Sequence, residues 1–201
     1  MKIRSVLTGA FAGLMLGCAA ASAQEAPAAP GRPDVKTVGD WMVRCFPVAN
    51  TNPCDMFQER VDQQSRQRVV TFSLAFVPSM NRHILQITVP LDVALQKGVT
   101  LQAGDYKSPL MKYRMCSREG CFVQIAPDNA VIEALARATV PNAGVNIVAD
   151  GGKPFSLPVS LKGFAAAHDD MVAQNRAKAK AAPAPCGARR RSIRWLDVGE
   201  N

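Results

Sequence analysis

Four cysteines are the residues of this chain whose type and spacing could carry chemistry. Cys45 and Cys54 bracket a segment rich in Pro, Asn and Thr, and Cys116 and Cys121 bracket Ser-Arg-Glu-Gly. Each segment suits a turn between two strands, which would place its two cysteines opposite each other. Proximity therefore favours disulfides between Cys45 and Cys54 and between Cys116 and Cys121 over the other connectivities that four cysteines allow.

The same four cysteines could instead bind one zinc ion. Neither pair has the C-x₂-C spacing that is typical of zinc knuckles and of redox-active thiols. We therefore expect two structural disulfides, with no metal and no cofactor.

The two histidines offer little support for catalysis. His83 begins a strand-like run, where we expect an exposed strand end, and His168 lies in an apolar stripe, where we expect a packing residue. The chain has no G-x-S-x-G elbow, phosphate-cradling glycine loop or H-E-x-x-H helix. We expect a protein that is not an enzyme. A hydrolase with carboxylates that converge from separate strands stays open, because such a site leaves no sequence motif.

The N-terminus is typical of an export signal. A short basic region, an apolar run over residues 6–17 and the small residues Ala21-Ser22-Ala23 predict a signal peptide over residues 1–23. The run is too short to span a bilayer, which takes roughly 20 residues. The mature chain would begin at Gln24 and fold in the periplasm or outside the cell, where thiols oxidise. Lipidation of Cys18, with outer-membrane association, is the alternative.

The composition along the chain predicts one folded domain between two irregular segments. Residues 24–38 are rich in Ala and Pro and predict a flexible leader, residues 39–175 predict the domain, and residues 176–201 predict a basic, disordered tail. A helix is expected where Pro127-Asp128-Asn129 offers capping groups and Val131, Leu135 and Ala138 follow at helical spacing, and a second helix is expected from about Ser160. Strand-like runs cover residues 41–45, 56–61, 69–77, 84–89, 99–102, 112–116, 121–125, 145–148 and 155–157.

These elements predict the fold class. In the third run Phe72, Leu74 and Phe76 alternate with small or polar residues, as in a strand with one face on a core. Many short strands and few helices exclude a parallel sheet, which needs a helix at nearly every crossover. We expect a mainly β, antiparallel, sandwich-like single domain with two short helices.

The positive charge belongs mostly to the tail. The chain carries a formal charge of +8. Seven basic and two acidic residues from Arg176 onward give the tail +5, and Lys2 and Arg4 belong to the signal, so residues 24–175 keep +1. In an exported protein this pattern favours anionic lipid or polysaccharide over nucleic acid as a partner. The candidate contacts are Arg189, Arg190, Arg191 and Arg194, and Cys186 is either a free thiol or a link between two copies of the chain.

Several motifs, taken in order, resemble one family. They are Gly39-Asp-Trp41-Met-Val-Arg-Cys45, Cys54 with Gln58, Val89-Pro90-Leu91 before Gly98-Val-Thr-Leu101, Cys116-x₄-Cys121 with Gly120, and Pro158-Val-Ser-Leu-Lys-Gly-Phe164. Over about residues 38–171 the chain is similar to the invasion-associated locus B family of exported alphaproteobacterial proteins.

The resemblance implies a secreted, periplasmic or outer-membrane-associated β-rich domain with two local disulfides. It implies no catalytic residues, and it makes Trp41 a core anchor. We therefore expect an envelope or host-surface interaction protein that could contribute to host-cell invasion, as a monomer or as a dimer linked through Cys186. A periplasmic binder of small ligands or polysaccharide is the alternative, and an aromatic-lined groove would favour it.

Overall fold

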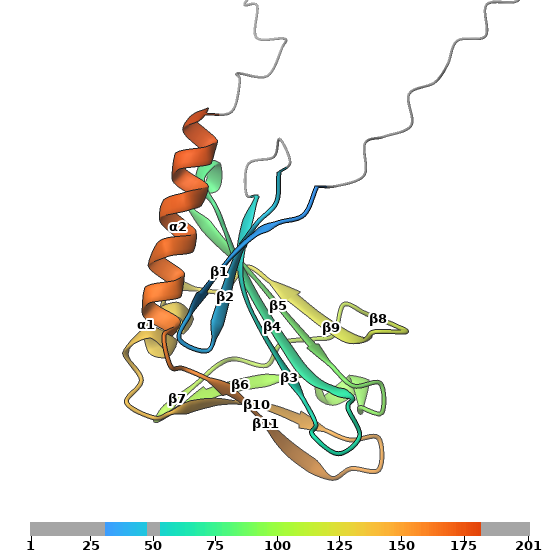
Figure 1. The fold of residues 1–201 in the computed structure, drawn as a ribbon. Helices are drawn as coiled ribbons and strands as arrows, with labels where there is room; N and C mark the ends of the chain where they lie inside the picture. Colours follow the sequence, from blue (N-terminus) through green and yellow to red (C-terminus); the bar gives the residue numbers. More distant parts are fainter. Residues whose placement is uncertain (1–30, 48–52, 182–201) are drawn as a thin grey trace, which may run out of the picture.

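The large sheet of the computed structural model has seven antiparallel strands in the order β1-β2-β3-β4-β5-β9-β8 (Figure 1). The structure describes residues 31–47 and 53–181. The strands of this sheet are β1 (Asp34–Val38), β2 (Trp41–Cys45), β3 (Cys54–Val61), β4 (Arg68–Val77), β5 (Arg82–Val89), β8 (Met115–Ser117) and β9 (Gly120–Ile125).

A smaller sheet and two helices complete the domain. The small sheet has the order β11-β10-β6-β7 and lies across the lower end of the large one in Figure 1. This is the mainly β, antiparallel single domain that the sequence predicts. The remaining elements are β6 (Thr100–Ala103), β7 (Tyr106–Lys107), β10 (Asn142–Val148), β11 (Pro154–Ser160), α1 (Asn129–Arg137), α2 (Phe164–Ala181) and the 3₁₀ turns η1 (Pro78–Met80) and η2 (Leu95–Lys97).

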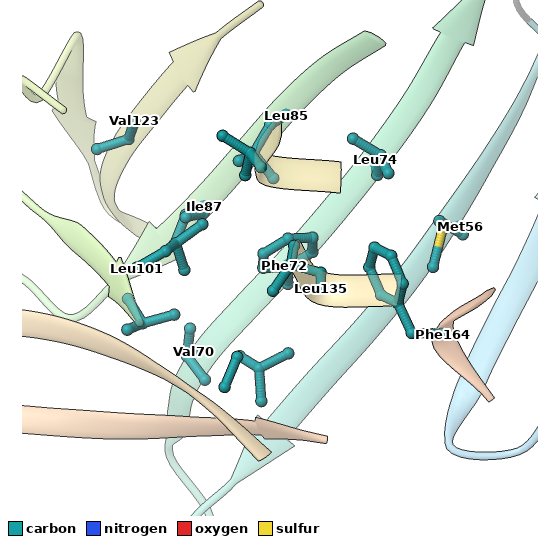
Figure 2. Close-up of a cluster of buried hydrophobic side chains, with 14 of the residues drawn as sticks. Met56, Val70, Phe72, Leu74, Leu85, Ile87, Leu101, Val123, Leu135 and Phe164 are labelled. Atoms are coloured by element: carbon teal, nitrogen blue, oxygen red, sulfur yellow. The ribbon is translucent and has the colours of Figure 1, made fainter. Parts of the chain in front are cut away.

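One hydrophobic core joins both sheets and both helices. Figure 2 shows side chains of this core, among them Phe72 from β4, Leu101 from β6 and Leu135 from α1. The predicted alternation on β4 is confirmed, because Phe72, Leu74 and Phe76 are all buried. Trp41 is fully buried and packs edge-to-face on Phe72 at 5.5 Å and on Phe164 at 5.2 Å between ring centroids. Trp41 is thus the core anchor that the resemblance implies.

A buried cluster of hydrogen bonds links β11 to the large sheet. The Gln58 side chain of β3 accepts from the Ser160 backbone N–H at 2.7 Å and donates to the Asp40 and Ser160 carbonyls at 3.0 and 3.3 Å. Trp41 Nε1 donates to the same Ser160 carbonyl at 3.0 Å. Gln58 is only 4% exposed, so its polar atoms need these partners.

The segment predicted as a flexible leader, residues 24–38, contains a strand, so the folded domain begins before residue 39. Residues 34–38 form β1, which pairs along its whole length with β2. Most of its side chains are exposed, so the segment carries no hydrophobic alternation that a pattern search could detect. The backbone ladder to β2 forms the strand instead.

Helix α2 corrects two further predictions. It begins at Phe164 rather than at about Ser160, because Ser160 still belongs to β11. It continues to Ala181, so the predicted tail starts inside the helix, and with 18 residues the helix is not short. Composition suggested an earlier end because polar residues follow Gln174. The structure gives one of them a partner, since the Arg176 guanidinium lies 5.2 Å from the Phe76 ring centroid.

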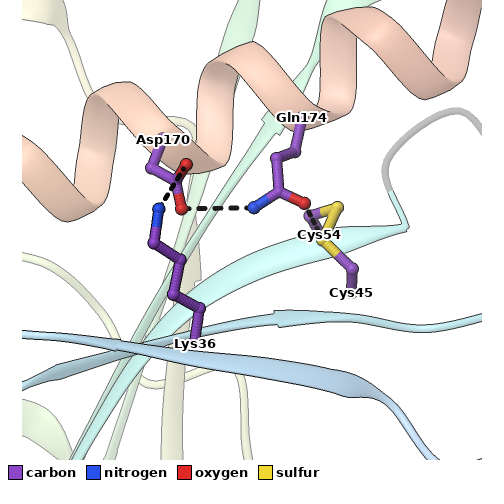
Figure 3. A network of polar contacts seen from close by, with 5 residues as sticks. All are labelled: Lys36, Cys45, Cys54, Asp170 and Gln174. Atoms are coloured by element: carbon purple, nitrogen blue, oxygen red, sulfur yellow. Dashed lines mark hydrogen bonds and ion pairs between the residues drawn. A yellow bond between two sulfur atoms is a disulfide. The ribbon is translucent and has the colours of Figure 1, made fainter.

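Both cysteine pairs form disulfides, Cys45 with Cys54 between β2 and β3 and Cys116 with Cys121 between β8 and β9. This agrees with the pairing that loop placement favours. Figure 3 shows the first disulfide beneath α2, where Gln174 Oε1 contacts Cys45 Sγ at 3.1 Å. Gln174 also donates to Asp170, which pairs with Lys36 of β1 at 3.1 Å.

One turn of α2 is held against β3 by a buried amide. Asn175 is fully buried, and its side chain accepts from the Cys54 N–H at 3.0 Å and donates to the Cys54 carbonyl at 2.9 Å. The pairing of β3 with β4 begins only at Asp55, so the Asn175 amide supplies the backbone partners that β4 does not give to Cys54.

We predict that Asn175→Ala lowers the free energy of unfolding by about 2 to 3 kcal/mol, because it leaves a buried N–H and a buried carbonyl without partners. Urea unfolding measures this loss. Lys178→Ala, at an exposed position of the same helix, is the control and should change stability by less than about 0.5 kcal/mol. Equal stability of the two variants would contradict the role assigned to Asn175.

Candidate functional site

The outward face of the small sheet carries polar side chains. Along β6 and β10 the residues alternate, so that Leu101, Val145 and Ile147 are buried in the core, while Thr100 and Asn146 point the other way. The strand pairing aligns Thr100 with Asn146 and Asn146 with Ser156, which forms one polar row across three strands.

A second row lies beside the first one. Gln102 of β6 is paired with Lys107 of β7 on one side and with Gly144 of β10 on the other. Gly144 belongs to this second row, and a Cβ atom there would lie 2.6 Å from Ser156 Oγ of the first row. A side chain at position 144 would therefore fill the middle of this face.

These rows line a groove with a volume of about 470 Å³. This volume falls within the range of small-ligand sites, roughly 300 to 1,000 Å³. Lys97, from the 3₁₀ turn before β6, and Lys107 bring positive charge to the lining. Among the described residues that line it there is no Asp, Glu or His, and the one aromatic residue is Phe155. The side chains can bind anions and hydroxyl groups.

The outward face of the large sheet has smaller hollows and a neutralised charge. Two of them, of about 250 and 270 Å³, share Gln86 and Gln124. Arg44 on this face is paired with Asp55 at 2.5 Å, and its guanidinium lies 3.8 Å from the Phe57 ring centroid. Its charge already has a partner, whereas no salt bridge involves Lys97 or Lys107 within residues 31–47 and 53–181.

Another hollow, of about 540 Å³, lies beside the edge strand β8. Its lining combines Lys112 and Arg114 with the exposed apolar side chains of Leu95 and Met115. Arg114 donates a hydrogen bond to Gln124, so one of the two cationic side chains of this lining already has a partner within the protein. The groove on the small sheet differs from this hollow because its two lysines lie beside rows of uncharged polar side chains.

The histidines form a pair that the sequence did not predict. His83 of β5 and His168 of α2 lie with their Nε2 atoms 2.9 Å apart, and Asp169 lies 3.1 Å from Nδ1 of His168. His83 is half-buried rather than exposed, which corrects the expectation of a free strand end. Burial lowers the pKa of His83 to about 4, and the adjacent His168 adds to this effect.

The pair lacks the partners of a nucleophilic site. In the part of the chain that the structure describes, no hydroxyl or thiol is hydrogen-bonded to either imidazole. Within the same residues, no three His, Cys, Asp or Glu side chains are grouped to hold a metal ion. What the geometry shows is a polar contact between α2 and β5.

Several residues singled out from the sequence lie outside the described residues. They are Cys18 and the rest of the predicted signal peptide, Cys186, and the candidate anionic contacts Arg189, Arg190, Arg191 and Arg194. None of the helices within residues 31–47 and 53–181 is long and apolar enough to cross a membrane. The groove residues Lys97, Lys107 and Asn146 were missed, because they come from separate segments and form no motif.

Comparisons with known proteins agree on one family. The family model described as "Invasion associated locus B (IalB) protein" matches residues 41–172. Invasion protein B homologues from two strains of Brucella abortus, 2308 and 9-941, are each 31% identical over 138 residues, which is 69% of this chain and 79% of each relative.

A solved structure supports the same assignment. The crystal structure of invasion associated protein B from Bartonella henselae superposes with a TM-score of 0.60 at 27% identity, over 71% of this chain and 99% of that one. The region matched by the family model contains Trp41, Gln58, both disulfides and the groove, and so includes the motifs on which the resemblance was based, apart from Gly39 and Asp40. The chain belongs to the invasion associated locus B family.

Proposed function

We propose that this protein is an exported interaction protein of the cell envelope or host surface, that it works by binding, and that it could contribute to host-cell invasion. The observation that carries this proposal is the groove on the small sheet, whose lining among the described residues is cationic and polar and includes no carboxylate or histidine. The N-terminal pattern and the two disulfides support export to an oxidising compartment, either the periplasm or the exterior.

The family motifs support binding rather than catalysis. Trp41, Gln58 and Ser160 are buried, and their polar atoms are used to join strands. A residue that is enclosed in this way cannot reach a substrate. The names of the Brucella and Bartonella proteins connect those relatives with invasion, and we extend that connection to this chain as part of the proposal.

Binding to cells tests the proposal. The labelled mature chain, residues 24–201, should bind saturably to host epithelial cells or to outer-membrane vesicles, and excess unlabelled protein should compete. Lys97→Gln/Lys107→Gln should weaken this binding, while His168→Gln should leave it intact. Absence of saturable binding to both surfaces would end the proposal, and so would turnover of an envelope substrate that is lost in His168→Gln.

The histidine pair gives a separate test of its structural role through pH. Because the pKa of His83 lies at about 4 in the folded chain and at its ordinary value of 6.5 when unfolded, the unfolded chain binds more protons between these values. The contribution of His83 is therefore fully present above about pH 6.5 and is lost as the pH falls toward 4. Groups near the pair are Asp169, which contacts His168, and Arg176, which lies over Phe76 next to His83.

We predict that the free energy of unfolding, measured with urea, falls between about pH 7 and about pH 5, and that His83→Gln reduces this fall. Glutamine keeps a polar group near His168 but does not titrate. An unchanged pH dependence in His83→Gln would contradict the assignment of this sensitivity to His83.

A further inference from the structure

We propose that the ligand of the groove is an acidic polysaccharide, a sugar chain that carries carboxylate or sulfate groups. This inference rests on the proposed function, because it names the class of partner for the same surface. The first argument is charge. Lys97 and Lys107 line the groove, and within residues 31–47 and 53–181 no carboxylate lines it with them. An anionic group would therefore meet cations without internal competition.

The second argument is the density of uncharged polar groups. Thr100, Asn146 and Ser156 form one cross-strand row, with Gln102 beside it. Hydroxyl and amide side chains both donate and accept hydrogen bonds, as sugar hydroxyls do. A simple inorganic anion would use the lysines but would leave these side chains without a role in recognition.

The third argument is the shape of the surface. Gly144 is paired with Gln102 and Pro158 beside the groove, and it has no side chain that would crowd Ser156 and Asn146. The groove crosses strands on a sheet face instead of following a strand edge. A peptide that adds a strand would use an edge, so a chain of sugar units lying across the face fits better.

An anionic membrane is the competing partner, and it makes a different prediction. A bilayer surface would be attracted by the charges of Lys97 and Lys107 alone, and it would not depend on the amide of Asn146. The predicted basic tail could also attract any polyanion. A test must therefore distinguish binding by the groove from binding by the tail. It must also distinguish the contribution of the Asn146 amide from that of the lysine charges.

The experiment is calorimetric titration of a heparin octasaccharide into mature chains in which Arg189, Arg190, Arg191 and Arg194 are all replaced by Gln. In this background we expect saturable binding that Lys97→Gln/Lys107→Gln weakens about tenfold, as two lost ion pairs would. We expect Asn146→Ala to weaken binding about fivefold without any change of charge, as one lost hydrogen bond would.

The matched control is Lys162→Gln/Lys178→Gln, which removes the same charge from exposed positions outside the groove. Its affinity should stay within about twofold of the background, and a neutral dextran octasaccharide should not bind. Equal losses in the control and groove variants would overturn the proposal in favour of diffuse attraction. Full affinity of Asn146→Ala, together with lysine-dependent binding to phosphatidylglycerol vesicles, would overturn it in favour of a membrane.

Cell binding separates this inference from the proposed function. If excess heparin octasaccharide displaces the labelled chain, with its four tail arginines replaced by Gln, from host cells or outer-membrane vesicles, the ligand class is supported. If the chain binds saturably but heparin neither binds nor competes, the ligand class is wrong and the interaction function stands.

Discussion

The hydrogen bonds between Gln58 and Ser160 are the constraint on which the rest of the fold depends. They join β3 to the end of β11, and Trp41 fixes the same carbonyl from β2. The turn after β1 and the turn after β11 can approach each other this closely only because each contains a glycine. A Cβ atom at Gly39 would lie 2.5 Å from the Lys162 carbonyl oxygen, and one at Gly163 would lie 2.6 Å from that of Val38. Both glycines also have positive φ angles, which other residues rarely adopt.

These hydrogen bonds determine which side of the small sheet faces away from the core. Ser160 ends β11, β11 pairs with β10, and β10 pairs with β6. Fixing one end of β11 to the large sheet therefore turns the apolar side of the small sheet into the shared core. The polar side, with Asn146 in its middle row, faces away from that core. The family motifs thus build most of the scaffold, while the groove combines Gly98 and Thr100 of one motif with residues outside the motifs, among them Lys97, Lys107 and Asn146.

The sequence predicted those parts of the fold that local patterns specify. Alternation identified β4, helical spacing identified α1, and the hairpin spacing around Cys116 and Cys121 led to the correct disulfide. It missed β1, whose exposed residues carry no pattern because the ladder to β2 forms that strand. It ended α2 too early, because the signal for the last turns is a tertiary contact between Asn175 and Cys54. The groove could not be predicted, since Lys97, Lys107 and Asn146 meet only through strand register.

The central claim is that binding uses the groove, while the buried motif residues Trp41, Gln58 and Ser160 hold the fold together. Chemical-shift mapping of the ¹⁵N-labelled mature chain during titration with heparin octasaccharide tests it most directly. The account predicts shifts of the backbone amides of Thr100, Gln102, Asn146 and Ser156, with little change at Gln86 and Gln124 on the large sheet. Shifts centred on the face of the large sheet or on His83 and His168, with the groove amides unmoved, would contradict it.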